Sequence, residues 1–272
     1  MTVQRFWIAA SGVMLAVAAS SPAFAGAWTA ARGASYNKFA FNYFAAESTF
    51  GPTTPGFERF ENINVSYYGE YGLLDNLTLF GSAAVANLAS TVNGQVVENG
   101  GLGDVDVGLR LRLLEKPFVL STQVLFKIPY FYNENNPLPL GNGQEDLEFR
   151  VLVGRGLGRL GYFGLEAGYR IRFQAPSDEF RYLIEYGFDV TEKFYLRTKL
   201  DGQIATQSTN AVIDLQSGNP QLPLAFNLAK VEATAGYKIN KTIAVEFTAT
   251  PAVFGDNILR GVTYQAALVA AF

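Results

Sequence analysis

The chain has 272 residues, a formal net charge of -3 and neither cysteine nor histidine. It therefore lacks the histidine base and the cysteine nucleophile of many hydrolases, the commonest zinc ligands and any disulfide framework. The nearly balanced charge, with no basic tail, gives no indication of nucleic-acid binding. We expect a protein that is not an enzyme and that has no cofactor, no metal site and no nucleic-acid partner.

The first 25 residues predict a secretory signal peptide. Arg5 precedes an apolar stretch at 6–19, and Ala23-Phe24-Ala25 forms a small-residue cleavage pattern. The apolar stretch is too short for the alternative, a transmembrane helix. We expect cleavage after residue 25, which leaves a single domain at 26–272.

An alternation with a period of two residues dominates the rest of the chain. Between residues 104 and 113, charged side chains and a glycine alternate with valine and leucine. Successive side chains of a strand point to opposite faces, so this segment is a strand with one charged and one apolar face. Similar segments predict about twelve strands. They lie at 35–47, 59–72, 77–88, 102–114, 118–130, 145–154, 162–174, 179–190, 193–206, 225–239, 242–254 and 258–272.

The connections between these segments alternate in length. Tight turns are expected at 74–76, 115–117, 191–192 and 240–241, and longer polar loops at 48–56, 89–101, 132–144 and 207–224. Two loops on the long side, at 175–178 and 255–257, are short. Short periplasmic turns and long outer loops are typical of outer-membrane barrels, so we expect both termini in the periplasm. The Gly-rich segment 156–161 matches a dinucleotide-binding pattern, but a strand follows it instead of a helix, which predicts a turn.

The apolar faces need either a second sheet or lipid. A soluble β-sandwich is the alternative to a membrane barrel, because its strands alternate too. In lipid, however, every backbone polar group must be paired and an open sheet edge is excluded, so the sheet must close. We therefore predict an all-β protein, a transmembrane antiparallel up-and-down β-barrel. Aromatic residues at strand ends predict girdles at the two membrane interfaces. They are Tyr67, Tyr68, Tyr71, Phe118, Tyr130, Phe131, Tyr132, Tyr162, Phe163, Phe173, Phe180, Phe194, Tyr195 and Phe254.

The last strand carries an apolar face that ends on an aromatic residue. Counting back from Phe272 in steps of two gives Ala270, Leu268, Ala266, Tyr264 and Val262. This pattern resembles the C-terminal assembly signal of bacterial outer-membrane β-barrels, with Tyr264, Leu268 and Phe272 as the signal residues. The resemblance implies a location in the bacterial outer membrane, with membrane lipid and the barrel assembly machinery as partners. We expect the last strand to pair with the first near Phe39, Phe41 and Tyr43.

In such a barrel the charged faces point into the lumen. In one interpretation they line a water-filled pore whose arginine residues favour anions such as carboxylates, which predicts passive diffusion of small polar or anionic organic solutes. In the alternative, acids and bases pair across neighbouring strands and close a structural or adhesion barrel whose outer loops bind a partner. A second alternative is a transporter of apolar ligands with aromatic residues inside. The predicted lumen-lining residues are Arg110, Arg112, Arg150, Arg170, Arg172, Arg181, Arg197, Lys199, Asp104, Asp106, Glu148, Glu166, Glu185 and Asp189.

One short motif adds a family resemblance. Gly101-Leu102-Gly103-Asp104 opens an alternating strand, and the expected mature start is Gly26-Ala27-Trp28-Thr29. Both are similar to features of the meta-pathway phenol degradation-like barrels, a family of outer-membrane transporters often encoded near genes for aromatic catabolism. The resemblance implies a channel for a small organic solute and carries over no functional residue.

Overall fold

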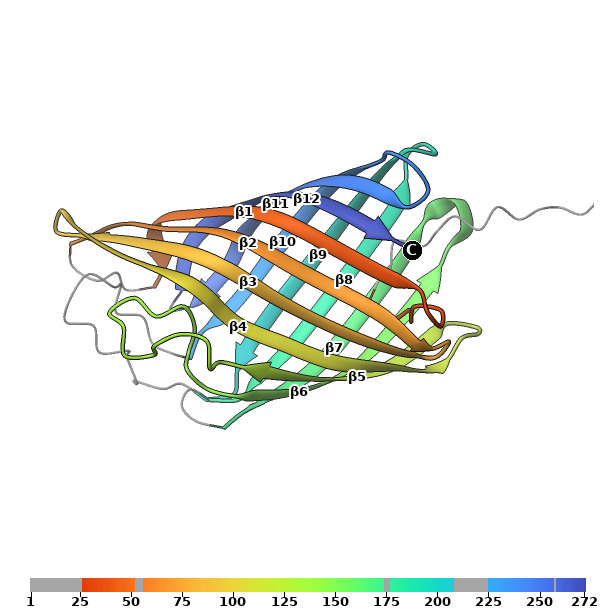
Figure 1. Cartoon of the computed structure of the whole chain (residues 1–272), viewed down its shortest axis with the longest axis horizontal. Coiled ribbons are helices and arrows are strands. Elements are labelled where there is room, and N and C mark those ends of the chain that lie inside the picture. The colour runs from red at the N-terminus through yellow and green to blue at the C-terminus, as the bar shows by residue number, and fades with distance from the viewer. Residues whose placement is uncertain (1–25, 52–55, 174–176, 208–224, 257) are drawn as a thin grey trace, which may run out of the picture.

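The computed structural model describes residues 26–51, 56–173, 177–207, 225–256 and 258–272, which form a closed barrel of twelve antiparallel strands (Figure 1). Each strand pairs with its neighbours in sequence, and the last pairs with the first, so the predicted fold class is confirmed. The predicted signal peptide and nearly all of the predicted loop at 207–224 lie outside the described residues. The strands are β1 (Ser35–Phe50), β2 (Phe57–Leu74), β3 (Leu77–Val92), β4 (Gln95–Leu114), β5 (Val119–Ile128), β6 (Asp146–Gly156), β7 (Tyr162–Arg172), β8 (Glu179–Asp189), β9 (Phe194–Ala205), β10 (Asn227–Lys238), β11 (Ile243–Asp256) and β12 (Ile258–Ala271).

Alternating burial along the strands follows the alternation of the sequence. In β9, Leu196 on the outward face is 43% exposed, whereas the preceding Tyr195 and the following Arg197 are buried. Polar side chains thus meet inside the barrel, while large apolar side chains cover its outer face. A barrel in a membrane requires this arrangement, because its outer face meets lipid and its inner face meets water or paired charges.

The barrel closes between β1 and β12. Phe39 pairs with Leu268, Phe41 with Ala266 and Tyr43 with Tyr264, as predicted. The backbone N–H of Ser35 donates to the Phe272 carbonyl at 2.9 Å, and the Phe272 N–H donates back to Ser35 at 2.9 Å. The three predicted assembly residues, Tyr264, Leu268 and Phe272, are 48%, 47% and 71% exposed.

Both ends of the described chain lie at one end of the barrel, termed here the terminal end, together with the short turns after β2, β4, β6, β8 and β10. The opposite end is termed the loop end. At the terminal end, the Gly-rich segment forms a turn with a short 3-10 helix, η1 (Gly158–Leu160), between β6 and β7, as predicted. Within the described ranges, no helix is long and apolar enough to cross a membrane.

The prediction of a long loop at 89–101 is wrong, because β3 and β4 continue to a two-residue turn at Asn93-Gly94. Both turn residues have positive φ, 50° for Asn93 and 73° for Gly94. Asn-Gly is the dipeptide favoured in tight hairpins because both residues tolerate this conformation. The long hairpin projects beyond its neighbours at the loop end (Figure 1).

Three aromatic residues predicted for the membrane girdles face the interior instead. The hydroxyl groups of Tyr162 and Tyr195 donate to the carboxylates of Glu185 and Glu246 at 2.6 and 2.7 Å. Tyr68 donates to Glu70. A buried tyrosine hydroxyl needs a hydrogen-bond partner, and the inward carboxylates supply it. A fourth, Tyr132, lies in the loop after β5 and donates to Asp104.

Candidate functional site

The interior of the barrel holds most of the predicted lumen residues, arranged in networks of ion pairs. One network begins on β4 and runs along β5, β6 and β7. The Lys127 ammonium lies 3.5 Å from the Asp104 carboxylate and 2.9 Å from that of Asp146. The Arg170 guanidinium reaches Asp146 at 3.5 Å and Glu148 at 2.7 Å. Neighbouring strands thus alternate positive and negative groups around this part of the wall.

Glu148 is the centre of this network. Its side chain is 0% exposed and its carboxylate also accepts a hydrogen bond from Nε of Arg150. The Nη1 atom of Arg150 lies 2.8 Å from the Glu166 carboxylate. Arg181 lies 3.9 Å from Glu148. A fully buried carboxylate is stable only when several donors compensate its charge, and three guanidinium groups do so here.

Arg172 and Arg181 share a carboxylate that sequence reasoning missed. Glu179 lies 2.5 Å from Arg172 and 3.3 Å from Arg181. Among the described residues, Nε and Nη1 of Arg172, Nε of Arg181 and Nε of Arg197 are buried without a hydrogen-bond partner. The Arg181 side chain as a whole is still 18% exposed.

A second network joins β1, β8, β9, β10 and β11. The Glu246 carboxylate binds Lys38 at 2.8 Å and Arg197 at 3.2 Å, and it accepts from Tyr195. Lys38 was not among the predicted lumen residues. It shares the inward face of β1 with Ala40 and Asn42, so the alternation of the sequence could have identified it as a lumen residue.

Lys199 extends the second network to two further acids. Its ammonium lies 3.6 Å from Glu185 and 3.7 Å from Glu232, and Glu232 also lies 3.5 Å from Arg197. Each predicted basic residue of the lumen therefore has a carboxylate within 4 Å. The pairing therefore provides no fixed excess of positive charge, so a preference for anions has to come from guanidinium groups that stay partly exposed, such as Arg181 at 18%.

A buried pair links β4 to β2 near the terminal end. Arg110 lies 3.1 Å from Glu70, and their side chains are 4% and 3% exposed. The Arg110 guanidinium also donates to the Trp28 carbonyl at 3.0 Å and lies over the Phe80 ring, 5.5 Å from its centroid. Glu70 was not among the predicted residues.

Three predicted residues are less firmly part of the interior. Arg112 and Asp189 lie at the terminal rim, where Arg112 faces Glu115 at 3.7 Å and Asp189 pairs with Lys238 at 2.8 Å. Asp106 points inward but accepts only a long hydrogen bond from Ser82, at 3.3 Å. One Asp106 oxygen has no partner.

Neutral polar side chains meet on the wall formed by β12, β1 and β2, beside the charged Lys38 and Glu70. Asn42 donates to Asn64 at 2.7 Å and to Ser66 at 2.9 Å, and it accepts from Gln265 at 2.7 Å. The interior therefore has a charged side and an amide side, and amides can both donate to and accept from a solute.

The segment before β1 enters the barrel at the terminal end, which sequence reasoning missed. Ala27 and Ala30 are 2% and 0% exposed. The Ser121 hydroxyl of β5 donates to the Ala27 carbonyl at 2.5 Å, and the Ala30 N–H donates to Thr78 of β3 at 2.9 Å. This terminal segment, residues 26–31, therefore crosses the inner faces of several strands and occupies part of the lumen.

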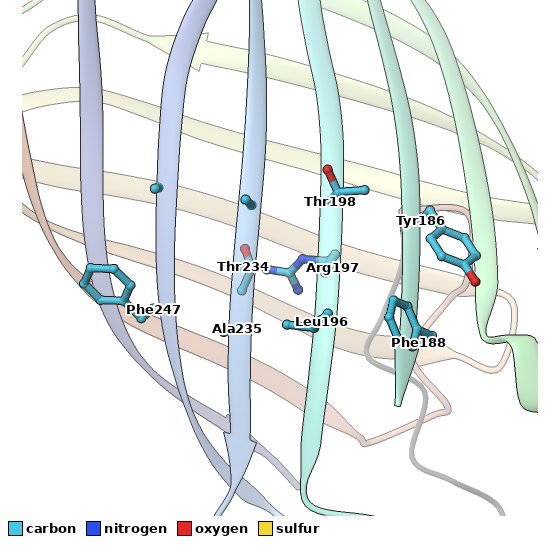
Figure 2. A pocket seen from close by; sticks show the side chains of 10 residues that line it. Tyr186, Phe188, Leu196, Arg197, Thr198, Thr234, Ala235 and Phe247 are labelled. Carbon is cyan, nitrogen blue, oxygen red and sulfur yellow. The ribbon is translucent and has the colours of Figure 1, made fainter. Parts of the chain in front are cut away.

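A groove of about 380 Å³ lies on the outside of the barrel, over β8 to β11. Figure 2 shows Phe247 on one side of it and Tyr186 and Phe188 on the other. Small side chains between these walls, including Ala233 and Ala235, leave the space open. Because its walls belong to the outward face, the groove is separate from the lumen.

Comparisons with known proteins identify the fold. The sequence matches no family model and no curated protein. Among solved structures, the COG4313 outer-membrane channel of Pseudomonas putida F1 has a TM-score of 0.72 and 15% identity, over 92% of this chain and 99% of that one. The NanC porin has a TM-score of 0.54 and 8% identity, over 86% and 98% of the two chains. The translocator domain of the autotransporter NalP from Neisseria meningitidis has a TM-score of 0.51 and 8% identity, over 89% of each chain. At these identities the likeness shows the fold alone.

Proposed function

We propose that the chain is a bacterial outer-membrane channel for passive diffusion of small polar or anionic organic solutes, with both termini in the periplasm. The observation that carries the proposal is the closed barrel with an apolar outer face and a charged inner face, where the side chains of Arg150, Arg170 and Arg181 stay 13%, 12% and 18% exposed. Such guanidinium groups attract carboxylates and can donate charge-assisted hydrogen bonds to them. Similarity of the fold to solved outer-membrane channels supports the same function.

One observation favours a second function. The ion pairs between neighbouring strands and the terminal segment both reduce the free space inside the barrel. A closed structural or adhesion barrel, whose loops bind a partner, would have these features too. Conductance in planar lipid bilayers separates the two functions, since the wild-type channel should pass current and the closed barrel should not.

Changing Arg181 to glutamine should reduce the preference for anions. The substitution removes one partly exposed positive charge, while Glu179 keeps Arg172 as a partner and glutamine retains hydrogen-bonding capacity toward Gln203. The reversal potential under a KCl gradient should shift toward the potential of potassium. The matched control is Arg159→Gln in the exposed terminal-end turn, which should leave the reversal potential unchanged. An Arg181→Gln channel with wild-type selectivity would contradict the role of this guanidinium group, and a wild type without conductance would overturn the channel itself.

Changing Phe272 to alanine should lower the amount of folded barrel in the outer membrane severalfold. Phe272 ends the closing strand and its ring is 71% exposed, so it is available to the assembly machinery. The variant is compared with the wild type by the shift in gel mobility on heating. Leu160→Ala, at another exposed apolar position, is the control and should have no effect. Purified Phe272→Ala should still fold into lipid vesicles, because that reaction needs no machinery; normal levels in cells would refute the role of Phe272 as a signal.

A further inference from the structure

The loop between β5 and β6, residues 129–145, lies against the inner side of β4 at the loop end. Leu138 in this loop is 2% exposed. The Asn99 amide of β4 donates to the Leu138 carbonyl at 2.8 Å, and the Tyr132 hydroxyl donates to the Asp104 carboxylate at 2.7 Å. Figure 1 shows this green segment folded back over the left-hand end of the barrel. The loop therefore occupies part of the opening of the barrel at the loop end, termed here the mouth.

The motif Gly101-Leu102-Gly103-Asp104 provides the contact surface for this loop. The register of β4 on β3 shifts between Val105 and Leu102, so two residues of β4 face one residue of β3 there. A bulge of this kind re-aims the side chains next to it. A Cβ atom on Gly101, where φ is +156°, would lie 3.2 Å from a Leu140 methyl group, and one on Gly103 would lie 3.5 Å from the Leu140 carbonyl oxygen. Glycine at position 101 thus leaves room for the Leu140 side chain, and Gly103 places the Leu140 main chain directly against β4.

Polar contacts beneath the loop connect it to the charged lumen. The Gly143 N–H donates to the Tyr132 hydroxyl at 2.8 Å, so that oxygen both accepts from the loop and donates to Asp104. Lys127 bridges Asp104 and Asp146 directly below. Burial raises the pKa of the Tyr132 hydroxyl, and the hydrogen bond to Asp104 raises it further. The hydroxyl thus remains a donor throughout the neutral pH range and is lost only as the pH rises through this raised value.

We propose that the β5–β6 loop is the element that limits the size of the solute at the loop end, and that the Gly101–Asp104 motif is its docking site. This inference rests on the proposed channel function. Asn99 and Asp104 hold the loop at two points, one on each side of the glycine contacts. The loop has no strand pairing with β4 in the described part of the chain, so these side-chain contacts help to determine how far it extends into the mouth.

The absence of cysteine from the sequence allows a direct test. A variant carries Tyr132→Phe, which removes the hydroxyl contacts, together with Asn99→Cys and Leu138→Cys, at two positions that the docked loop holds in hydrogen-bond contact. Proteoliposomes containing the variant are assayed by swelling in arabinose and in the larger sugar raffinose. Under reducing conditions the raffinose rate should rise severalfold over the wild type, and oxidation should return it to the wild-type rate. Tyr132→Phe alone, with and without reductant, controls for the reagent.

The outcomes separate the two proposals. Equal raffinose rates in the reduced and oxidised variant would overturn the role of the loop while leaving the channel intact. If the cysteine pair does not oxidise, the reduced variant alone decides, and a raffinose rate equal to that of the wild type overturns the role of the docking contacts. A wild type that admits no arabinose would refute the channel function itself. Folding of each protein is checked by the gel shift on heating.

Discussion

Deleting residues 27–31 should raise the single-channel conductance severalfold. The terminal segment lies inside the lumen, where Ala27 packs with Val119 and Leu152 and the Trp28 ring meets Tyr162 edge to face at 5.9 Å between centroids. Ion flow through a pore depends steeply on its narrowest cross-section, and removing the segment widens this end. The barrel itself should persist, because strand pairing begins only at Ser35. Conductance is measured in planar bilayers at fixed salt concentration.

Two further variants make this test specific. Replacing the same five residues with glycine and serine keeps the length but removes the Trp28 contacts, so the conductance should rise and fluctuate. Arg32→Ala, in the exposed turn just outside the lumen, should have wild-type conductance. A deletion variant that conducts like the wild type would show that the narrowest point lies elsewhere. The mouth covered by the β5–β6 loop would then be the place to examine.

The wall of the barrel could be predicted from the sequence because its constraints are local and repeated. Lipid outside and charge inside impose the same period of two on every strand, so the alternation around Asp104 and Arg110 indicates both the strand and its orientation. The pairing of Phe39 with Leu268 follows from the same logic, since a closed sheet must join its first and last strands. The error at 89–101 was also local, because the Asn93-Gly94 turn signal stands in the sequence.

The contents of the lumen could not be predicted in the same way. The terminal segment has no periodicity, and its position depends on partners as distant as Thr78, Arg110 and Ser121. The inward tyrosines Tyr68 and Tyr195 occupy positions that alternate correctly for the lumen, but their clustering at strand ends resembles a girdle. Tyr68 has its carboxylate partner, Glu70, two residues away on the same strand, whereas Glu246, the partner of Tyr195, lies on β11. Contacts across the barrel are set by its closure and not by neighbours in sequence.

The pair Arg110–Glu70 should be the most costly to break in the barrel wall. Both side chains are almost fully buried, and Arg110 also supports the terminal segment through the Trp28 carbonyl. Removing one partner of a buried pair leaves an uncompensated charge and typically costs about 3–5 kcal/mol. We therefore expect Arg110→Met, which keeps much of the side-chain volume, to lower the free energy of unfolding by about this amount.

Unfolding by urea in lipid vesicles measures this loss. The double variant Arg110→Met with Glu70→Gln should lose less than Arg110→Met alone, because no buried charge is then left without a partner. The control is Arg59→Met, whose partners Glu47 and Glu61 lie at 2.9 Å but whose side chain is 41% exposed, and it should destabilise the barrel far less than Arg110→Met. A double variant as unstable as Arg110→Met would assign the loss to packing against Phe80. Since Arg110 joins β2, β4 and the terminal segment, Arg110→Met should also raise the conductance toward that of the deletion variant.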